Sequence, residues 1–167
     1  PGPVIEDVKH TPNVPLDHQD LLVTARVRPS FRTIGSVSMR YRIMFSNEVT
    51  TPMFDDGAHG DGLAGDSVFG ATIPATLSTN GQMIRYLIAA SDINANPSRW
   101  PLFVTNTGMA EYLGTIVDPT NVTSKLPIYH LFVSPQNLAP IDTENGGKAW
   151  IFYDGEFYDN ITMELRG

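Results

Sequence analysis

The sequence contains no cysteine, which excludes disulfide bonds, thiolate metal ligands and thiol nucleophiles but leaves the redox compartment open. Positive charge is also scarce, because 11 Lys and Arg face 18 Asp and Glu, for a formal net charge of −7. A chain of this sign lacks the general electrostatic footprint for binding nucleic acid or an anionic membrane. No apolar run approaches the ~20 residues that span a bilayer, so membrane insertion is not expected.

Helical periodicity is missing from the first two thirds of the chain, where apolar residues instead recur with the period of two that is typical of half-buried strands. This alternation occurs at 21–27, 37–45, 69–73 and 84–90, and residues 111–117 form a further candidate strand. Short strands separated by turn residues over about 100 residues predict an all-β, antiparallel immunoglobulin/fibronectin type III-like sandwich. Because a cysteine pair is absent, the fibronectin type III kind is favoured.

The composition changes after Asp118, which predicts three parts: a sandwich at 1–118, a linker at 119–125 and a C-terminal β extension at 126–167. In the extension, 126–133 is a candidate strand, and Ser134 followed by Pro135 predicts one turn of helix. The Asp154-Gly155 pair between two strand-like runs predicts a β-hairpin. A hairpin with one extra strand cannot form its own core, so it either packs on the sandwich or begins a second domain.

The least generic stretch is 54–73, which begins with a loop rich in aspartate and glycine, called here the Asp/Gly loop (residues 54–66). Its carboxylates are Asp55, Asp56, Asp61 and Asp66. One interpretation is a Ca²⁺ site, because hard cations bind six to eight oxygen ligands, although the EF-hand spacing is absent. The other interpretation, which we favour, is a self-bonded turn in which each carboxylate accepts backbone N–H groups. His59 lies among them as a lone imidazole.

A second candidate site is positively charged. Arg40, Arg42 and Arg85 alternate with apolar residues on two strands that are usually neighbours in such sandwiches, so we expect them on a solvent-exposed face. They would form a docking patch for an acidic protein or a polyanionic glycan, since guanidinium groups bind carboxylates in a bidentate fork. The alternative is an ordinary solvated face.

Aromatic and histidine residues offer weaker signals. Trp100, Tyr112, Trp150 and Phe152 could stack on sugars, or could simply belong to the core. Tyr86 could bond the backbone at a sandwich corner, or could be a core aromatic. The four histidines are scattered, and neither a G-x-S-x-G elbow nor a phosphate-binding G-x-x-x-x-G-K-[ST] motif is present, so no catalytic residue is predicted and no cofactor is required.

Three stretches resemble secreted bacterial proteins in which an immunoglobulin-like or fibronectin-like module precedes a spore coat protein H-like kinase domain. They are DDGAHGDGLAGDSVFGATIP, in which Ser67 replaces a more usual glycine, GQMIRYLIAASDINANPSRWP, and LPIYHLFVSPQNL through FYDGEFYDNITMELRG. The resemblance implies a sandwich followed by the first strands of an atypical kinase, whose nucleotide- and metal-binding residues would lie downstream of Gly167.

The expected function is therefore that of a non-catalytic spacer that positions a neighbouring kinase-like domain of the same chain. We expect it to be secreted or in the cell envelope. If the Asp/Gly loop binds Ca²⁺, the ion would stabilise the spacer. Two alternatives are a structural part of an atypical kinase and a carbohydrate-binding accessory module. Because the chain starts at Pro1 without a basic-then-apolar leader, we expect a fragment or a processed product, with any export signal outside it.

Overall fold

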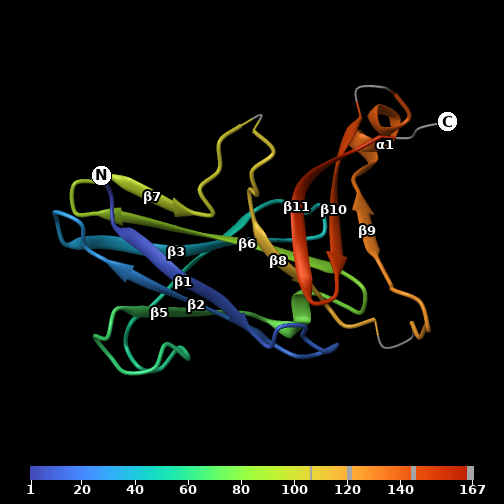
Figure 1. Ribbon diagram of the computed structural model, residues 1–167. Coiled ribbons are helices and arrows are strands. Elements are labelled where there is room, and N and C mark those ends of the chain that lie inside the picture. The colour runs from blue at the N-terminus through green and yellow to red at the C-terminus, as the bar shows by residue number, and fades with distance from the viewer. Residues whose placement is uncertain (106, 120–121, 144–145, 165–167) are drawn as a thin grey trace.

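The computed structural model describes residues 1–105, 107–119, 122–143 and 146–164. Two antiparallel sheets face each other in the N-terminal part (Figure 1). The first sheet has the order β1-β2-β5 and consists of β1 (Val4–Thr11), β2 (Leu21–Arg28) and β5 (Val68–Ile73). The second consists of β3 (Ile34–Ile43), β4 (Val49–Pro52), β6 (Met83–Asp92), β7 (Pro97–Trp100) and β8 (Leu113–Ile116). These sheets confirm the predicted β-sandwich.

Strand β6 is the centre of the second sheet. It pairs with β3 along nearly its whole length on one side, and on the other side with β8 at its beginning and β7 at its end. The sheet order is β4-β3-β6-β7, with β8 added beside β6. A short 3-10 helix, η1 (Ala75–Leu77), leads from β5 towards β6.

The sandwich core consists of the apolar residues that the alternation predicts. Leu21, Val23, Ala25 and Val27 of β2 are 0–1% exposed, and they share one cluster with Met39 of β3. Their polar neighbours in sequence lie on the opposite face of each strand, as expected from a period of two. The predicted core strands at 21–27, 37–45, 69–73 and 84–90 are confirmed within a few residues at their ends.

A third sheet, of order β11-β10-β9, occupies the C-terminal part. It consists of β9 (His130–Val133), β10 (Gly147–Tyr153) and β11 (Glu156–Met163), and α1 (Pro135–Ile141) precedes β10. The predicted hairpin is confirmed: Asp154 and Gly155 both have positive φ, 50° and 82°, as a type I′ turn requires. The predicted helical turn is confirmed with Pro135 in its first turn. Within the described ranges, no helix has the length and apolar character needed to cross a membrane.

The third sheet packs on the sandwich and forms a second apolar cluster with it. Met83 of β6 and Ile116 of β8 meet Phe132 of β9 and Phe152 of β10 there, and all four side chains are buried. In Figure 1 the third sheet, orange to red, stands beside β8 at the end of the sandwich where β6 begins. The first half of β6 is consequently buried on both faces, whereas the sequence pattern predicted one buried face.

Three strands were not predicted, namely β1 and two short strands, β4 and β7. Strand β4 contains two threonines and ends at Pro52, and β7 begins at Pro97 directly after a cluster of turn residues. Proline is confined to sheet edges and strand ends because it cannot donate a ladder hydrogen bond. Conversely, the strand predicted at 126–133 is limited to its second half, at His130–Val133.

A side-chain hydrogen bond connects β1 to β6 through the sandwich. The Tyr86 hydroxyl lies 2.8 Å from His10 Nδ1, and His10 Nε2 lies 3.0 Å from the Asn13 carbonyl oxygen. Because a carbonyl only accepts, Nε2 carries the proton, and Nδ1 of the neutral ring accepts the bond from Tyr86. Tyr86 is 1% exposed, which confirms the core alternative, and its partner is a side chain rather than the backbone. Burial raises the pKa of Tyr86.

We predict an acid-sensitive stability that depends on His10. Burial lowers the pKa of His10 below its ordinary value of 6.5, so the unfolded state binds a proton first as the pH falls. The free energy of unfolding should therefore be fully retained above pH ~6.5 and should decrease as the pH falls from there towards the folded-state pKa. Urea unfolding at a series of pH values between about 4.5 and 8 measures this.

The matched variants are His10→Asn and His18→Asn, because the His18 side chain is 84% exposed. His10→Asn should flatten the pH dependence in this window, whereas His18→Asn should preserve it. An unchanged slope in His10→Asn would contradict the assignment.

Candidate functional site

The Asp/Gly loop is closed by its own carboxylates, and Asp55 joins its two ends. Asp55 Oδ1 accepts hydrogen bonds from the backbone N–H of Gly65 (2.8 Å) and Asp66 (3.2 Å). Its other oxygen, Oδ2, accepts from Ser67 N–H at 3.0 Å. Because these donors lie 10 to 12 residues further along the chain, Asp55 fixes the loop as one compact turn.

Asp61 occupies the interior of the loop and is 2% exposed. Its Oδ2 accepts from Gly57 N–H at 2.7 Å, and its Oδ1 accepts from His59 N–H at 2.9 Å. The hydrogen bond from Gly57 is the main reason that the pKa of Asp61 is lowered, since it stabilises the ionised carboxylate. A Cβ added at Gly70 would clash with the His59 carbonyl oxygen, so the loop packs directly on the backbone of β5.

Asp56 and Asp66 bond to close neighbours in sequence. Asp56 Oδ1 accepts from Ala58 N–H at 2.9 Å and lies 2.9 Å from His59 Nδ1, and that side-chain bond is the main cause of its lowered pKa. Asp66 Oδ1 accepts from Val68 N–H at 2.9 Å. All four carboxylates thus make the bonds that the self-bonded interpretation requires. Among the residues that the structure describes, no group of three or more His, Asp or Glu is arranged to hold a metal ion. Calcium binding stays a prediction.

The three arginines of the predicted patch do lie on neighbouring strands, but they do not share a solvent-exposed face. Across β3 and β6, Arg42 pairs with Arg85 and Arg40 pairs with Leu87. The Arg40 side chain is 48% exposed, whereas Arg85 is only 4% exposed. The prediction of an exposed Arg85 is therefore wrong, because the third sheet covers this part of β6.

Arg85 forms the polar centre of the junction between the sandwich and the third sheet. Its Nη2 donates to the Met44 carbonyl oxygen at 2.7 Å. The guanidinium carbon lies 4.6 Å from the centroid of the Trp150 ring, 5.3 Å from that of Tyr112 and 5.9 Å from that of Phe45. At these distances a desolvated cation is attracted to each aromatic ring. Arg85 of β6 is thus enclosed by aromatic side chains from both parts of the chain.

Asp159 of β11 is the acidic counterpart of Arg85 in this junction, and it is 7% exposed. Its Oδ2 accepts from the backbone N–H of Glu111 (2.6 Å) and Tyr112 (3.0 Å), which connects the third sheet to the segment that leads into β8. Burial raises the pKa of Asp159, and the two backbone bonds and the Arg85 charge oppose that rise. Burial likewise lowers the pKa of Arg85, opposed by the charge of Asp159.

Further hydrogen bonds span the junction around this pair. Asn160 Nδ2 donates to the Met109 carbonyl at 3.0 Å, and Asn13 Nδ2 donates to the Gly155 carbonyl at 3.3 Å. On the sandwich side of the junction, Tyr112 donates its hydroxyl proton to Glu48 Oε2 at 2.8 Å, and burial raises the pKa of Tyr112 to about 12. The third sheet is therefore attached by polar contacts as well as by the apolar cluster.

The aromatic residues considered for sugar stacking divide between core and surface. Tyr112 and Phe152 are buried, which confirms the core alternative for these two. Trp150 packs on Arg85 and on Phe45, whose ring centroid is 5.5 Å away. Trp100 is 39% exposed and pairs with Ile88 across β6 and β7.

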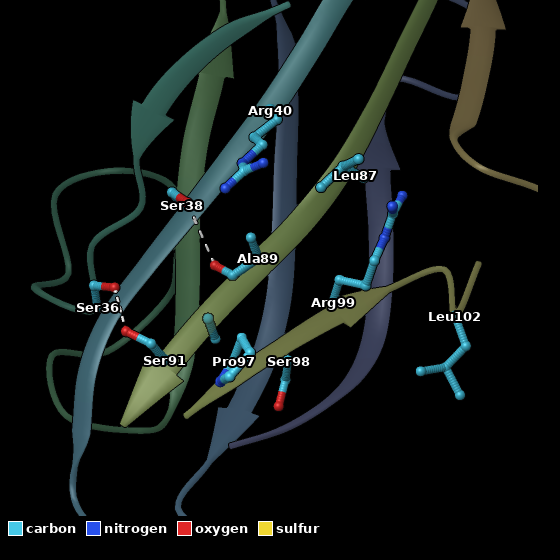
Figure 2. Close-up of a pocket in the computed structure, with 11 residues that line it drawn as sticks. Ser36, Ser38, Arg40, Leu87, Ala89, Ser91, Pro97, Ser98, Arg99 and Leu102 are labelled. Atoms are coloured by element: carbon cyan, nitrogen blue, oxygen red, sulfur yellow. Dashed lines mark hydrogen bonds between the residues drawn. The ribbon is translucent and has the colours of Figure 1, made fainter. Parts of the chain in front are cut away.

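The second half of β6 is open to solvent on its outer face and carries a groove of about 550 Å³ (Figure 2). Cross-strand register places Ser36 beside Ser91 and Ser38 beside Ala89, with Arg99 of β7 next to Ala89. We call this feature the serine groove; its lining includes Ser36, Ser38, Arg40, Leu87, Ala89, Ser91, Ser98, Arg99 and Leu102. Sequence reasoning missed it because Arg99 directly follows a cluster of turn residues and no strand was predicted there, although the serines of β3 alternate visibly with core residues.

Two facing antiparallel sheets of three and five strands define an immunoglobulin-like β-sandwich. A family model described as the conditioned medium factor 2nd Ig-like domain matches residues 12–88, which run from the end of β1 to the middle of β6. The match and the strand arrangement agree on an immunoglobulin-like module. A search of curated proteins finds no match.

We predict that the Asp/Gly loop stabilises the fold without calcium. Asp61→Ala removes a buried carboxylate that accepts from two partly buried backbone N–H groups, so it should lower the midpoint of thermal unfolding markedly and by the same amount in EDTA and in millimolar Ca²⁺. Asp7→Asn is the control, because the Asp7 side chain is 72% exposed and asparagine tolerates the positive φ of 51° at this position, and it should change the midpoint little. A Ca²⁺-induced rise in the wild-type midpoint that disappears in Asp61→Ala would instead establish a cation site.

Proposed function

We propose that this chain is a non-catalytic structural module of a secreted or cell-envelope multidomain protein, and that it holds a neighbouring domain in a fixed orientation. The observation that carries this proposal is the buried Arg85 centre, through which the third sheet is attached to the sandwich. A module that only tethers its neighbour needs a linker, whereas a module that orients it needs a specific, desolvated junction.

The chemistry of the junction supports orientation rather than simple adhesion. An apolar contact tolerates sliding, but the bonds from Asp159 to two backbone N–H groups and from Arg85 to the Met44 carbonyl have defined directions. A shift of the third sheet by one residue would leave these buried polar groups without partners, which costs about 1–3 kcal/mol for each group. The junction therefore favours one relative position.

The neighbour that we propose is the kinase-like domain implied by the sequence resemblance, with the third sheet as its first strands. This role does not require calcium, because the carboxylates of the Asp/Gly loop already accept backbone N–H groups; calcium bound there in addition would stiffen the loop. In Figure 1 this loop extends from β5 on the side of the sandwich away from the third sheet, so calcium there would act on the sandwich rather than on the junction.

The proposal predicts that the sandwich and the third sheet tumble as one body. Residual dipolar couplings of backbone amides in β2 and β6, and separately in β10 and β11, should fit one common alignment tensor. Two tensors of different magnitude or direction would contradict a fixed orientation, since independent motion averages the couplings of each part differently.

The second part of the test is a variant of the junction. Arg85→Met keeps an unbranched side chain but removes the charge and the bond to Met44, so it should lower the free energy of unfolding by about 2 kcal/mol. In this variant, the residual dipolar couplings of the sandwich and of the third sheet should no longer fit one alignment tensor. Arg28→Met is the matched control because the Arg28 side chain is 57% exposed, and its effect should stay within about 0.5 kcal/mol. Equal stability of the two variants would contradict a central role for Arg85.

A further inference from the structure

We propose that the serine groove binds an anionic polysaccharide that carries carboxylates along its chain. The groove is independent of the junction, because it lies over the second half of β6 and over β7, where the third sheet does not cover the outer face. Its chemistry, small hydroxyl side chains between guanidinium groups, indicates the class of ligand.

The floor of the groove is low because its side chains are small. Ser36, Ser38, Ala89 and Ser91 occupy adjacent positions on β3 and β6, and they follow the strands across the outer face. The Ser36 and Ser91 hydroxyls lie 2.9 Å apart, and Ser38 donates to the Ala89 carbonyl at 3.4 Å (Figure 2). Hydroxyls can both donate and accept, which matches the hydroxyl-rich surface of a sugar chain.

The charge of the groove is positive although the whole protein is acidic. Arg40 and Arg99 are the charged residues among those that line it, and Figure 2 shows them on opposite sides of β6. Glu48 lies 3.7 Å from Arg40 Nη1, but both side chains are partly exposed, and such pairs contribute little. A carboxylate of the ligand can therefore compete for Arg40.

Arg99 is held in place before any ligand arrives. Its Nη2 donates to the Glu111 carbonyl at 2.6 Å, and its guanidinium lies 5.5 Å from the centroid of the Phe103 ring. Its Nε is buried and has no hydrogen-bond partner among the described residues, so a ligand would bind the other guanidinium nitrogens. A fixed guanidinium loses less conformational entropy when it binds a carboxylate.

The spacing of the two arginines favours a polymer over a small anion. Arg40 and Arg99 lie on strands that are separated by β6, which places their backbones about 10 Å apart at the usual strand spacing. Arg99 is held at the Glu111 carbonyl and cannot turn towards Arg40 without losing that bond, so a chain with repeated carboxylates contacts both guanidinium groups more readily than one small carboxylate does.

A polysaccharide also fits better than an acidic peptide. Extended peptides bind mainly through backbone bonds to a free sheet edge, but β6 at the floor is paired with β3 on one side and β7 on the other. The floor therefore offers side-chain hydroxyls rather than free backbone groups. Leu102, which is 61% exposed, supplies an apolar wall for the face of a sugar ring.

The test is an NMR titration of the whole chain with a galacturonate tetramer, with maltotetraose as the neutral sugar and a tetraglutamate peptide as the acidic peptide. The galacturonate tetramer should shift amides of β3, β6 and β7 in a saturable manner, and the affinity should fall as NaCl is raised. The other two probes should bind at least about tenfold more weakly, since each lacks either the carboxylates or the sugar hydroxyls.

Three variants make the test specific. Arg40→Gln should weaken binding about tenfold, because it removes one charge-assisted contact without touching the core. Ala89→Leu should abolish binding by filling the floor while both arginines remain. Arg28→Gln, on the other sheet, should bind like the wild type. Unfolding midpoints measured in parallel verify that each variant is folded.

The proposal is overturned by any of three results. The first is that the galacturonate tetramer causes no saturable shifts. The second is that folded Arg40→Gln or folded Ala89→Leu binds the tetramer with wild-type affinity. The third is that maltotetraose or the tetraglutamate peptide binds as tightly as the tetramer. Equal binding of the peptide would assign the groove to acidic proteins instead.

Discussion

The structure depends on the burial of one cation, Arg85, in the middle of the molecule. It lies on β6, the central strand of the second sheet, where the opposite face of the same strand already contributes to the sandwich core. A buried guanidinium costs free energy unless its charge is compensated and its donors find partners. The Met44 carbonyl accepts from Nη2, and the three aromatic rings and the charge of Asp159 compensate the cation, although Nε is buried without a hydrogen-bond partner among the described residues. Trp150 and Asp159 come from the third sheet, so the burial of Arg85 in the sandwich depends on the third sheet being packed against it.

This requirement divides the outer face of the second sheet into two regions with different roles. The half around Arg85 and β8 is covered by the third sheet and fixes the orientation of that sheet on the sandwich. The half around Ala89 and β7 is open to solvent and carries the serine groove. The Asp/Gly loop is a separate unit that stabilises itself through Asp55 and Asp61. A module of this design can hold a neighbour at one end and leave a binding surface free at the other.

Much of the fold could be predicted from the sequence because a period of two and Asp154-Gly155 are local signals. Strand β7 could not, since Pro97 and the preceding turn residues hide it. The burial of Arg85 was also beyond sequence reasoning, because an arginine among alternating apolar residues normally marks a solvent face. Its covering partner, Trp150, is distant in sequence. For the Asp/Gly loop the residue types indicated a compact turn, but only the backbone path determines whether Asp61 faces N–H groups or a cation.

The most direct test of the central claim is native-state hydrogen exchange of amides in the third sheet and in the sandwich core. If Arg85 joins the two parts into one cooperative unit, the slowest amides of β10 and β11 should exchange with the same free energy of opening as those of β2 and β6. Arg85→Met should remove this agreement, so that amides of β10 and β11 open at a lower free energy than those of β2 and β6. Third-sheet amides that open at a much lower free energy than the core, in the wild-type chain, would show that the third sheet detaches on its own and would contradict the account.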